Sequence, residues 1–233
     1  MSLFVIVSGI IGAGKTTQAK ALAKIFDNSA CIEETVSEHP TLSEYYASID
    51  RYMADPNPTN LKLLQQVALI TQQIFLFDRW HKHNQAFIVN KNIFADRSIY
   101  EDGIFASMLT KKGWMDRDSY YKGYLNAYTT LTGFLRPPDL NVYLECDTEW
   151  AYQNVLNRSR EMEQKAVSRD YLASLNDNYA MWINAYPYNT LIVKSSDLDK
   201  EGYGLAEKVK NYFSDLYGFS PLKQSIREEI LKV

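Results

Sequence analysis

The sequence predicts an α/β fold in which helices flank a five-stranded parallel sheet. Five short apolar runs have the length and composition of buried strands, and a helix-length segment separates each run from the next. A glycine-rich stretch joins the first run to the first helical segment, where a phosphate group can meet a helix N-terminus. The chain has 233 residues, 46% of them hydrophobic, enough to bury one large core. We therefore expect a single domain over residues 1–233.

The predicted strands are the apolar runs Leu3–Ser8, the weaker Ala30–Ile32, Asn92–Ala95, Leu140–Leu144 and Thr190–Val193. The predicted helices are Thr16–Ile25, Leu61–Trp80, Ile99–Leu109, Glu149–Asn157, Tyr171–Trp182 and Gly204–Leu216. Prolines set two boundaries, because proline disfavours helix at the residue before it. We expect a loop at Asp55–Thr59, and Leu135–Asp139 ends a helix before the fourth strand.

Charge and composition exclude several classes of protein. The net charge is −3 and no block of five like charges occurs, so nothing predicts binding to a nucleic acid polymer. The apolar start runs for about six residues before Gly9, shorter than the apolar part of a secretion signal or a membrane span. Cys31 and Cys146 lie far apart without metal-ligand spacing. We expect a cytoplasmic protein that handles small molecules and does not contact a membrane.

The segment from Gly9 to Thr16 fits the phosphate-binding pattern G-x-x-x-x-G-K-[ST] at every fixed position. Its glycines let backbone N–H groups turn around phosphate oxygens. Lys15 is expected to reach the β- and γ-phosphates of a nucleotide, and the Thr16 hydroxyl to bind Mg²⁺. The predicted nucleotide-binding residues are Gly9, Gly12, Ala13, Gly14, Lys15, Thr16 and Thr17.

A guanine-specific switch protein would also need an N-K-x-D sequence to read guanine. Residues 90–93 begin that pattern but end in Ile93, and they precede a predicted strand where the motif should follow one. The sequence therefore argues against a switch GTPase and favours a kinase.

Acidic residues follow two of the predicted strands. Glu34 comes after the second strand and Asp96 after the third, with Arg97 directly behind it. In an open parallel sheet, ligands bind beyond the carboxyl ends of the strands. A kinase acting on an alcohol needs a carboxylate for the hydroxyl proton, a cation to steer it, and support for Mg²⁺. These three residues can supply all three functions.

Two further groups of polar residues suit the same reaction. Arg158 and Arg160 follow the helix after the fourth strand, where a lid at about residues 158–168 would bring positive charge over the transferred phosphoryl group. Gln72 and Arg79 share one face of a largely apolar helix, where an amide and a guanidinium can bind the edge of a nucleobase. The alternative is that each group caps a helix at the surface.

Taken together, these motifs resemble the deoxynucleoside kinases, the family of deoxycytidine, deoxyguanosine and bacterial deoxyadenosine kinases. The resemblance covers nearly the whole chain and lies in the family's order. Its five parts are Gly9–Thr17, Glu34–Val36 with His39–Pro40, Gln72–Arg79, Asp96–Asp102 and Arg158–Glu163. It implies a P-loop kinase fold with a short arginine-bearing lid, ATP and Mg²⁺ as cofactors, and a homodimer that packs helices near Leu61–Trp80 and Ile99–Leu109.

Carried over by position, the resemblance implies a role for each residue. Glu34 accepts the 5′-hydroxyl proton, Arg97 holds both partners and Asp96 supports Mg²⁺, although some descriptions of the family make this acid the base. Tyr46 and Glu163 bind the 3′-hydroxyl. Gln72 pairs with the base edge, next to a charged pair of Arg79 with Asp102. That pair favours deoxyadenosine, deoxyguanosine or deoxycytidine over thymidine.

The chain departs from the family pattern at two places. Thr35 stands where proline usually follows the catalytic glutamate, and the stretch from Tyr46 to Gln72 is longer than usual. Tyr45 or Tyr52 could therefore take the place of Tyr46.

The predicted activity is transfer of the γ-phosphate of ATP to the 5′-hydroxyl of a deoxynucleoside in nucleotide salvage. One alternative is a nucleoside monophosphate kinase of the thymidylate type, in which Glu34 would repel the acceptor's phosphate. Another is a nucleotide-binding regulatory module without turnover. Neither the preferred deoxynucleoside nor the use of GTP as donor follows from the sequence.

Overall fold

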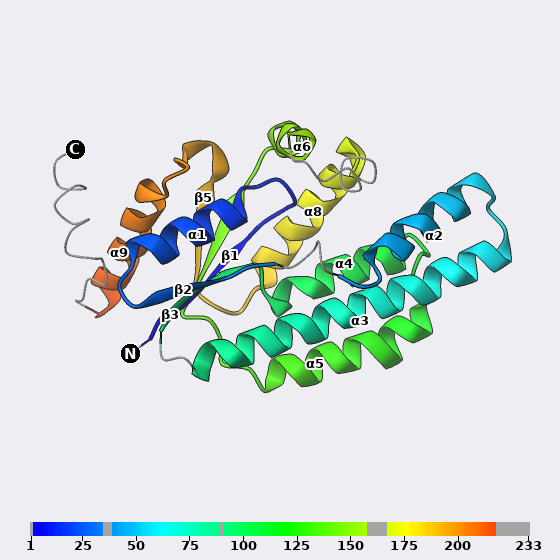
Figure 1. The fold of residues 1–233 in the computed structure, drawn as a ribbon, viewed down its shortest axis with the longest axis horizontal. Helices are drawn as coiled ribbons and strands as arrows, with labels where there is room; N and C mark the ends of the chain where they lie inside the picture. The colour runs from blue at the N-terminus through cyan, green and yellow to red at the C-terminus, as the bar shows by residue number, and fades with distance from the viewer. Residues whose placement is uncertain (1, 35–38, 89–90, 158–166, 218–233) are drawn as a thin grey trace.

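The described residues of the computed structural model form one parallel sheet with helices on both faces (Figure 1). The structure describes residues 2–34, 39–88, 91–157 and 167–217. The strands are β1 (Phe4–Ser8), β2 (Ser29–Ile32), β3 (Asn92–Asp96), β4 (Leu140–Glu145) and β5 (Thr190–Lys194), in the order β2-β3-β1-β4-β5. All five predicted strands are confirmed, and each differs from its prediction by one residue at one end.

Register in the sheet places the site residues side by side. Val7 of β1 pairs with Asp96 of β3, and Ser8 of β1 pairs with Tyr143 of β4. Ile32, the last residue of β2, pairs with Ala95. Parallel strands end at one edge, so Gly9, Glu33 and Arg97 all leave the sheet on the same side.

The helices are α1 (Lys15–Ile25), α2 (Leu42–Ala54), α3 (Pro58–Ile88), α4 (Ile99–Lys111), α5 (Leu125–Gly133), α6 (Thr148–Leu156), α8 (Arg169–Ala185) and α9 (Tyr203–Tyr217). A π-helical turn, η1 (Ser119–Tyr124), precedes α5, and a 3₁₀ turn, η2 (Ser195–Asp197), follows β5. In Figure 1, α1 and α9 lie on one side of the sheet and α3 with α5 on the other.

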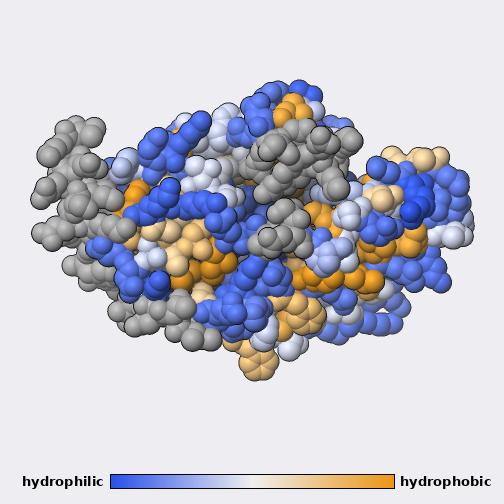
Figure 2. Space-filling view, viewed as in Figure 1, coloured by the Kyte–Doolittle hydropathy of each residue, from blue (hydrophilic) through white to orange (hydrophobic). Residues whose placement is uncertain are grey.

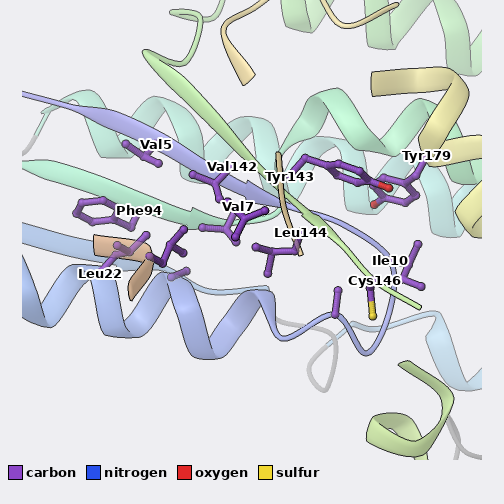
Figure 3. Packing of buried hydrophobic residues seen from close by; sticks show 14 of the residues in the cluster. Val5, Val7, Ile10, Leu22, Phe94, Val142, Tyr143, Leu144, Cys146 and Tyr179 are labelled. Atoms are coloured by element: carbon purple, nitrogen blue, oxygen red, sulfur yellow. The ribbon is translucent and has the colours of Figure 1, made fainter. Parts of the chain in front are cut away.

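Each face of the sheet has its own core, because successive strand residues point to opposite faces. Val5 and Val7 of β1 and Leu22 of α1, labelled in Figure 3, belong to one core, which also includes Phe213 of α9. Phe4 and Ile6 belong to the other core, with buried residues of α3 and α4. Central strands buried on both faces read as continuous apolar runs, which is why the sequence identified them.

Two predictions about the helices were wrong. The loop predicted over Asp55–Thr59 ends at Asn57, because α3 begins at Pro58. Proline fits the first turn of a helix, where its missing N–H costs nothing, and the Asn57 side chain accepts the backbone N–H of Asn60 at 2.9 Å. Helix α2, for which no helix was predicted, forms a hairpin with α3 that extends from the body of the molecule (Figure 1).

No helix within the described ranges is long and apolar enough to cross a membrane.

Candidate active site

A cavity of about 230 Å³ opens at the carboxyl edge of the sheet. Its lining comes from the start of α1, the residues after β2, the first turns of α2, the middle of α3, the β3–α4 junction and the start of α8. The predicted residues in its wall are Lys15, Thr16, Glu34, Tyr46, Gln72, Arg79, Asp96, Arg97 and Asp102. Residues from six separate parts of the sequence therefore face one space.

The glycine-rich turn between β1 and α1 has a backbone shape that favours glycine. Gly12 and Gly14 have φ of +88° and +90°, where a side chain is strained. At Gly12 an added Cβ would lie 2.3 Å from the Ala151 carbonyl oxygen, so any larger residue would collide with α6. At Gly14 nothing lies within 4 Å, and this open space adjoins the N-terminus of α1. The turn therefore leaves room for a ligand next to Gly14, at the N-terminus of α1.

Lys15 and Thr16 begin α1 at the base of this turn. The Lys15 ammonium donates to the Ile10 carbonyl at 2.7 Å. Burial, together with the positive charge of Arg97, lowers the pKa of Lys15 to about 8. A nucleotide's phosphates would supply the negative charge that this buried ammonium needs. Thr17, also predicted to bind nucleotide, is exposed on the first turn of α1.

The residues present fit a magnesium ion. The Thr16 hydroxyl donates to Asp96 Oδ2, so the two oxygen ligands predicted from the sequence are in contact. Asp96 Oδ1 is buried and has no hydrogen-bond partner among the described residues. Mg²⁺ prefers such hard oxygen ligands and usually binds through one or two protein groups, waters and phosphate oxygens. No group of three or more His, Cys, Asp or Glu side chains within the described ranges could hold a metal ion.

Glu34 lies between two arginines. Arg97 Nε donates to Glu34 Oε2 at 3.0 Å, and Arg79 Nη2 donates to Glu34 Oε1. The Glu34 side chain is 18% exposed. Burial alone would raise its pKa, but the charges of Arg97 and Arg79 outweigh this effect and lower the pKa to about 2. Glu34 is therefore ionised at neutral pH.

Arg97 also belongs to a network that sequence reasoning missed. Its Nη1 donates to the Tyr179 hydroxyl at 2.6 Å and lies 3.4 Å from Glu101 Oε2. Glu101 closes a Ser-x-x-Glu capping box at the start of α4, accepting the Ser98 backbone N–H at 3.1 Å. That motif was a readable signal for Glu101. Tyr179 belongs to α8, about eighty residues later, and nothing local in the sequence marks it.

The other end of the cavity combines charge with aromatic rings. Arg79 forms an ion pair with Asp102, as the sequence predicted, and its guanidinium lies 5.1 Å from the Phe75 ring centroid. Gln72 and Arg79 are both buried and line the cavity, so they do not cap the helix at the surface. Phe105 lines the cavity too, below the guanidinium of Arg97 at 5.0 Å. A planar base could be read here by its polar edge and packed against a ring.

Of the three tyrosines considered for the sugar, Tyr45 and Tyr46 line the cavity, whereas Tyr52 does not. Their rings lie 5.5 Å apart, in the first turns of α2. Burial raises the pKa of Tyr45, so its hydroxyl keeps its proton. Arg158, Arg160 and Glu163 lie outside the described residues, as does the predicted lid except for its last two residues, 167 and 168.

Comparison with known proteins agrees with this geometry. Residues 5–215 match the deoxynucleoside kinase family. The chain is 33% identical to the deoxyadenosine/deoxycytidine kinase of Bacillus subtilis over 82% of this chain and 83% of that protein. It is also 33% identical to the deoxyadenosine kinase of Dictyostelium discoideum over 74% of this chain, a match that spans 63% of that protein's length.

Solved structures show the same fold. The deoxyadenosine kinase from M. mycoides, solved with products dCMP and a flexible dCDP bound, superposes with a TM-score of 0.72 at 24% identity, over 89% of this chain and 98% of that one. Its structure with bound dATP gives a TM-score of 0.71. The glycine turn, the acids at two strand ends and the match over residues 5–215 lead to one conclusion. The chain belongs to the deoxynucleoside kinase family, the phosphotransferases that phosphorylate deoxynucleosides.

Proposed function

We propose that the chain transfers the γ-phosphate of ATP, with Mg²⁺, to the 5′-hydroxyl of deoxyadenosine, deoxyguanosine or deoxycytidine. One observation carries the proposal: Glu34 and Asp96 line the same cavity as Lys15, next to the glycine turn. That arrangement leaves space for a sugar hydroxyl next to a terminal phosphate.

The proposal assigns a separate role to each group of residues around the cavity. In this proposal the nucleotide site is formed by Gly9, Gly12, Ala13, Gly14 and Thr17. Lys15 neutralises the negative charge of the phosphates bound there. Thr16 and Asp96 would hold Mg²⁺, which neutralises charge developing on the phosphate oxygens. Because Asp96 already contacts the Thr16 hydroxyl, we assign the metal to Asp96 and the hydroxyl proton to Glu34.

With a pKa near 2, Glu34 is a weak base, but phosphoryl transfer does not require a strong base. The transition state is loose, so most of the rate comes from positioning and charge stabilisation, with little demand for base strength. The two arginines hold the Glu34 carboxylate in place, and it would orient the 5′-hydroxyl and take its proton late in the reaction. Arg158 and Arg160 remain proposed lid residues on sequence grounds, as Glu163 remains a proposed ligand of the 3′-hydroxyl.

The base end of the cavity supports the choice of acceptor. Gln72 would bind the base edge, and the ion pair of Arg79 with Asp102 would lie next to it. Asp102 Oδ2 is buried without a hydrogen-bond partner among the described residues, so an exocyclic amino group could donate to it. Adenine, guanine and cytosine carry such a group, and thymine does not. We assign the 3′-hydroxyl to Tyr46, with Tyr45 as its neighbour.

A panel of the four deoxynucleosides and their monophosphates, each with ATP·Mg²⁺, tests the proposal. We expect phosphorylation of at least one amino-bearing deoxynucleoside, with kcat/KM for thymidine at least tenfold lower. Phosphorylation of monophosphates alone would instead support a thymidylate-type kinase. Absence of ATP consumption with every acceptor would support the non-enzymatic module.

We also propose a homodimer that forms through α3. Val67, Ile70, Ile74 and Phe77 recur at helical spacing on one face, and Ile70 and Phe77 are 48% and 52% exposed. Figure 2 shows hydrophobic side chains gathered along α3 on this side of the molecule. Such a stripe is typical of a subunit interface. In light-scattering measurements we expect twice the chain mass for the wild type and a monomer for Phe77→Glu; a monomeric wild type would reject the dimer.

A cytoplasmic location stays a prediction, which cell fractionation tests.

A further inference from the structure

Arg97 adopts an unusual backbone conformation directly after β3. Its φ is +69°, in the left-handed region that residues other than glycine rarely occupy. The residue is 4% exposed, and its backbone N–H donates to the Val7 carbonyl at 3.1 Å. A strained residue persists where its surroundings hold it, so the contacts of its side chain matter.

The guanidinium of Arg97 makes its contacts through two nitrogens, Nε and Nη1. Nε contacts Glu34 at 3.0 Å, on the cavity side. Nη1 contacts the Tyr179 hydroxyl at 2.6 Å, and its distances to Glu101 Oε2 and to the Gly9 carbonyl are both 3.4 Å. The Tyr179 hydroxyl is thus the closest partner of Nη1, and the other two contacts are weak by comparison.

Tyr179 is itself fixed by packing, so it can hold Arg97 in one orientation. It is fully buried in α8, its ring stacks on Tyr143 with centroids 6.1 Å apart, and it meets Trp182 edge-on at 5.8 Å. Figure 3 shows the Tyr143 and Tyr179 rings side by side. The hydroxyl donates its proton to Glu101 Oε2 at 2.6 Å, so its oxygen is oriented to accept from Arg97.

Resting on the proposed function, we propose that the Tyr179 hydroxyl is a positioning group for phosphoryl transfer. Tyr179 does not line the cavity, so it does not touch the reactants. It fixes the Nη1 end of Arg97, and the rigid planar guanidinium then sets the direction in which Nε faces Glu34. Without the hydroxyl, Arg97 can turn on its long side chain and Glu34 loses its fixed orientation toward the 5′-hydroxyl. Small misplacements of this kind reduce turnover strongly.

Tyr179→Phe tests the proposal because it removes one oxygen and keeps the packed ring. We expect kcat to fall about tenfold, while KM for ATP and for the deoxynucleoside stays within twofold. Tyr143→Phe is the matched control, since Tyr143 is also buried and stacks on the same ring without contacting Arg97; we expect its kcat within twofold of wild type. A role in folding alone would lower the yield or melting temperature of Tyr179→Phe and leave kcat per folded molecule unchanged, which would overturn the proposal.

A double variant shows whether the effect passes through Glu34. In the Glu34→Gln background, measured by single turnover at high enzyme concentration, Tyr179→Phe should cost less than twofold, because no carboxylate remains to be oriented. An equal tenfold loss in both backgrounds would reject the coupling, and so would a Tyr179→Phe rate within twofold of wild type. A wild type inactive on every deoxynucleoside would overturn the proposed function itself.

Discussion

Replacing Glu34 with glutamine removes one negative charge from the cavity and leaves the shape of the side chain almost unchanged. The proposed base is lost, and a general base typically contributes 10²–10⁴-fold to turnover. With its low pKa, Glu34 is a weak base, so we expect the lower part of this range, a fall in kcat of about 10²–10³-fold.

The contacts around Glu34 show that the variant should still fold. Arg79 keeps its ion pair with Asp102, and Arg97 keeps Tyr179 and Glu101. We therefore expect a loss of about 1–3 kcal/mol in unfolding free energy, the usual cost of breaking buried polar contacts. The cavity also becomes more positive by one charge, so ATP should bind as tightly as in the wild type or more tightly.

Steady-state kinetics, ATP binding by calorimetry and urea unfolding measure the three quantities. Glu33→Gln is the matched control: Glu33 also lines the cavity, but its side chain is 50% exposed and pairs with Lys20 instead of the two arginines. We expect this control to keep kcat within twofold, since surface ion pairs contribute little. A Glu34→Gln kcat within threefold of wild type would show that Glu34 is not the base, and would return that role to Asp96.

Two further predictions concern the base end and the pH dependence of stability. Arg79→Val combined with Asp102→Ala should raise the ratio of kcat/KM for thymidine to that for the preferred deoxynucleoside at least tenfold, because the Asp102 carboxylate that would accept from an exocyclic amino group is gone. Total rates should fall, since Arg79 also holds Glu34. An unchanged ratio would mean that the pair does not select the base. His83 is 2% exposed and packs edge-on against Phe4, and burial lowers its pKa to about 3. In the unfolded chain its pKa is near 6.5. At a pH between these two values, His83 is neutral in the native state and protonated in the unfolded state. The unfolded state therefore binds more protons between these values, and stability falls as pH decreases below 6.5 by up to about 1.4 kcal/mol per unit. Between pH 7 and pH 5.5, the wild type should lose about 1 kcal/mol more than His83→Phe in urea unfolding; parallel losses would show that His83 does not titrate as proposed.

The sequence predicted the sheet and the main acids well, for physical reasons that particular residues show. Buried parallel strands such as Phe4–Ser8 are covered on both faces, so they stand out in the sequence as short apolar runs. Glu34 and Asp96 could be paired in advance because the carboxyl ends of neighbouring parallel strands share an edge. Helix α2 did have a readable signal, because Leu42, Tyr45, Tyr46, Ile49 and Met53 recur at helical spacing, but the sequence reasoning did not use it.

Contacts that depend on how the helices pack could not be predicted from the sequence. Arg79 was predicted to pair with Asp102, yet it also contacts Glu34, because α3 passes close to the end of β2. Tyr179 reaches Arg97 because α8 packs against α4. Neither contact has a local pattern, and each required the packed fold to be seen.

The ion pairs of the cavity constrain how this enzyme could change during evolution. Arg79 bridges Glu34 and Asp102, so losing Arg79 alone leaves the Asp102 carboxylate buried without its ion-pair partner, a state that costs several kcal/mol. A lineage that shifts its preference among bases would thus have to exchange Arg79 and Asp102 nearly together, with Glu34 retained by Arg97 alone. New specificities would then appear in relatives as paired replacements, and intermediates that lose Arg79 before Asp102 would be unstable and rare.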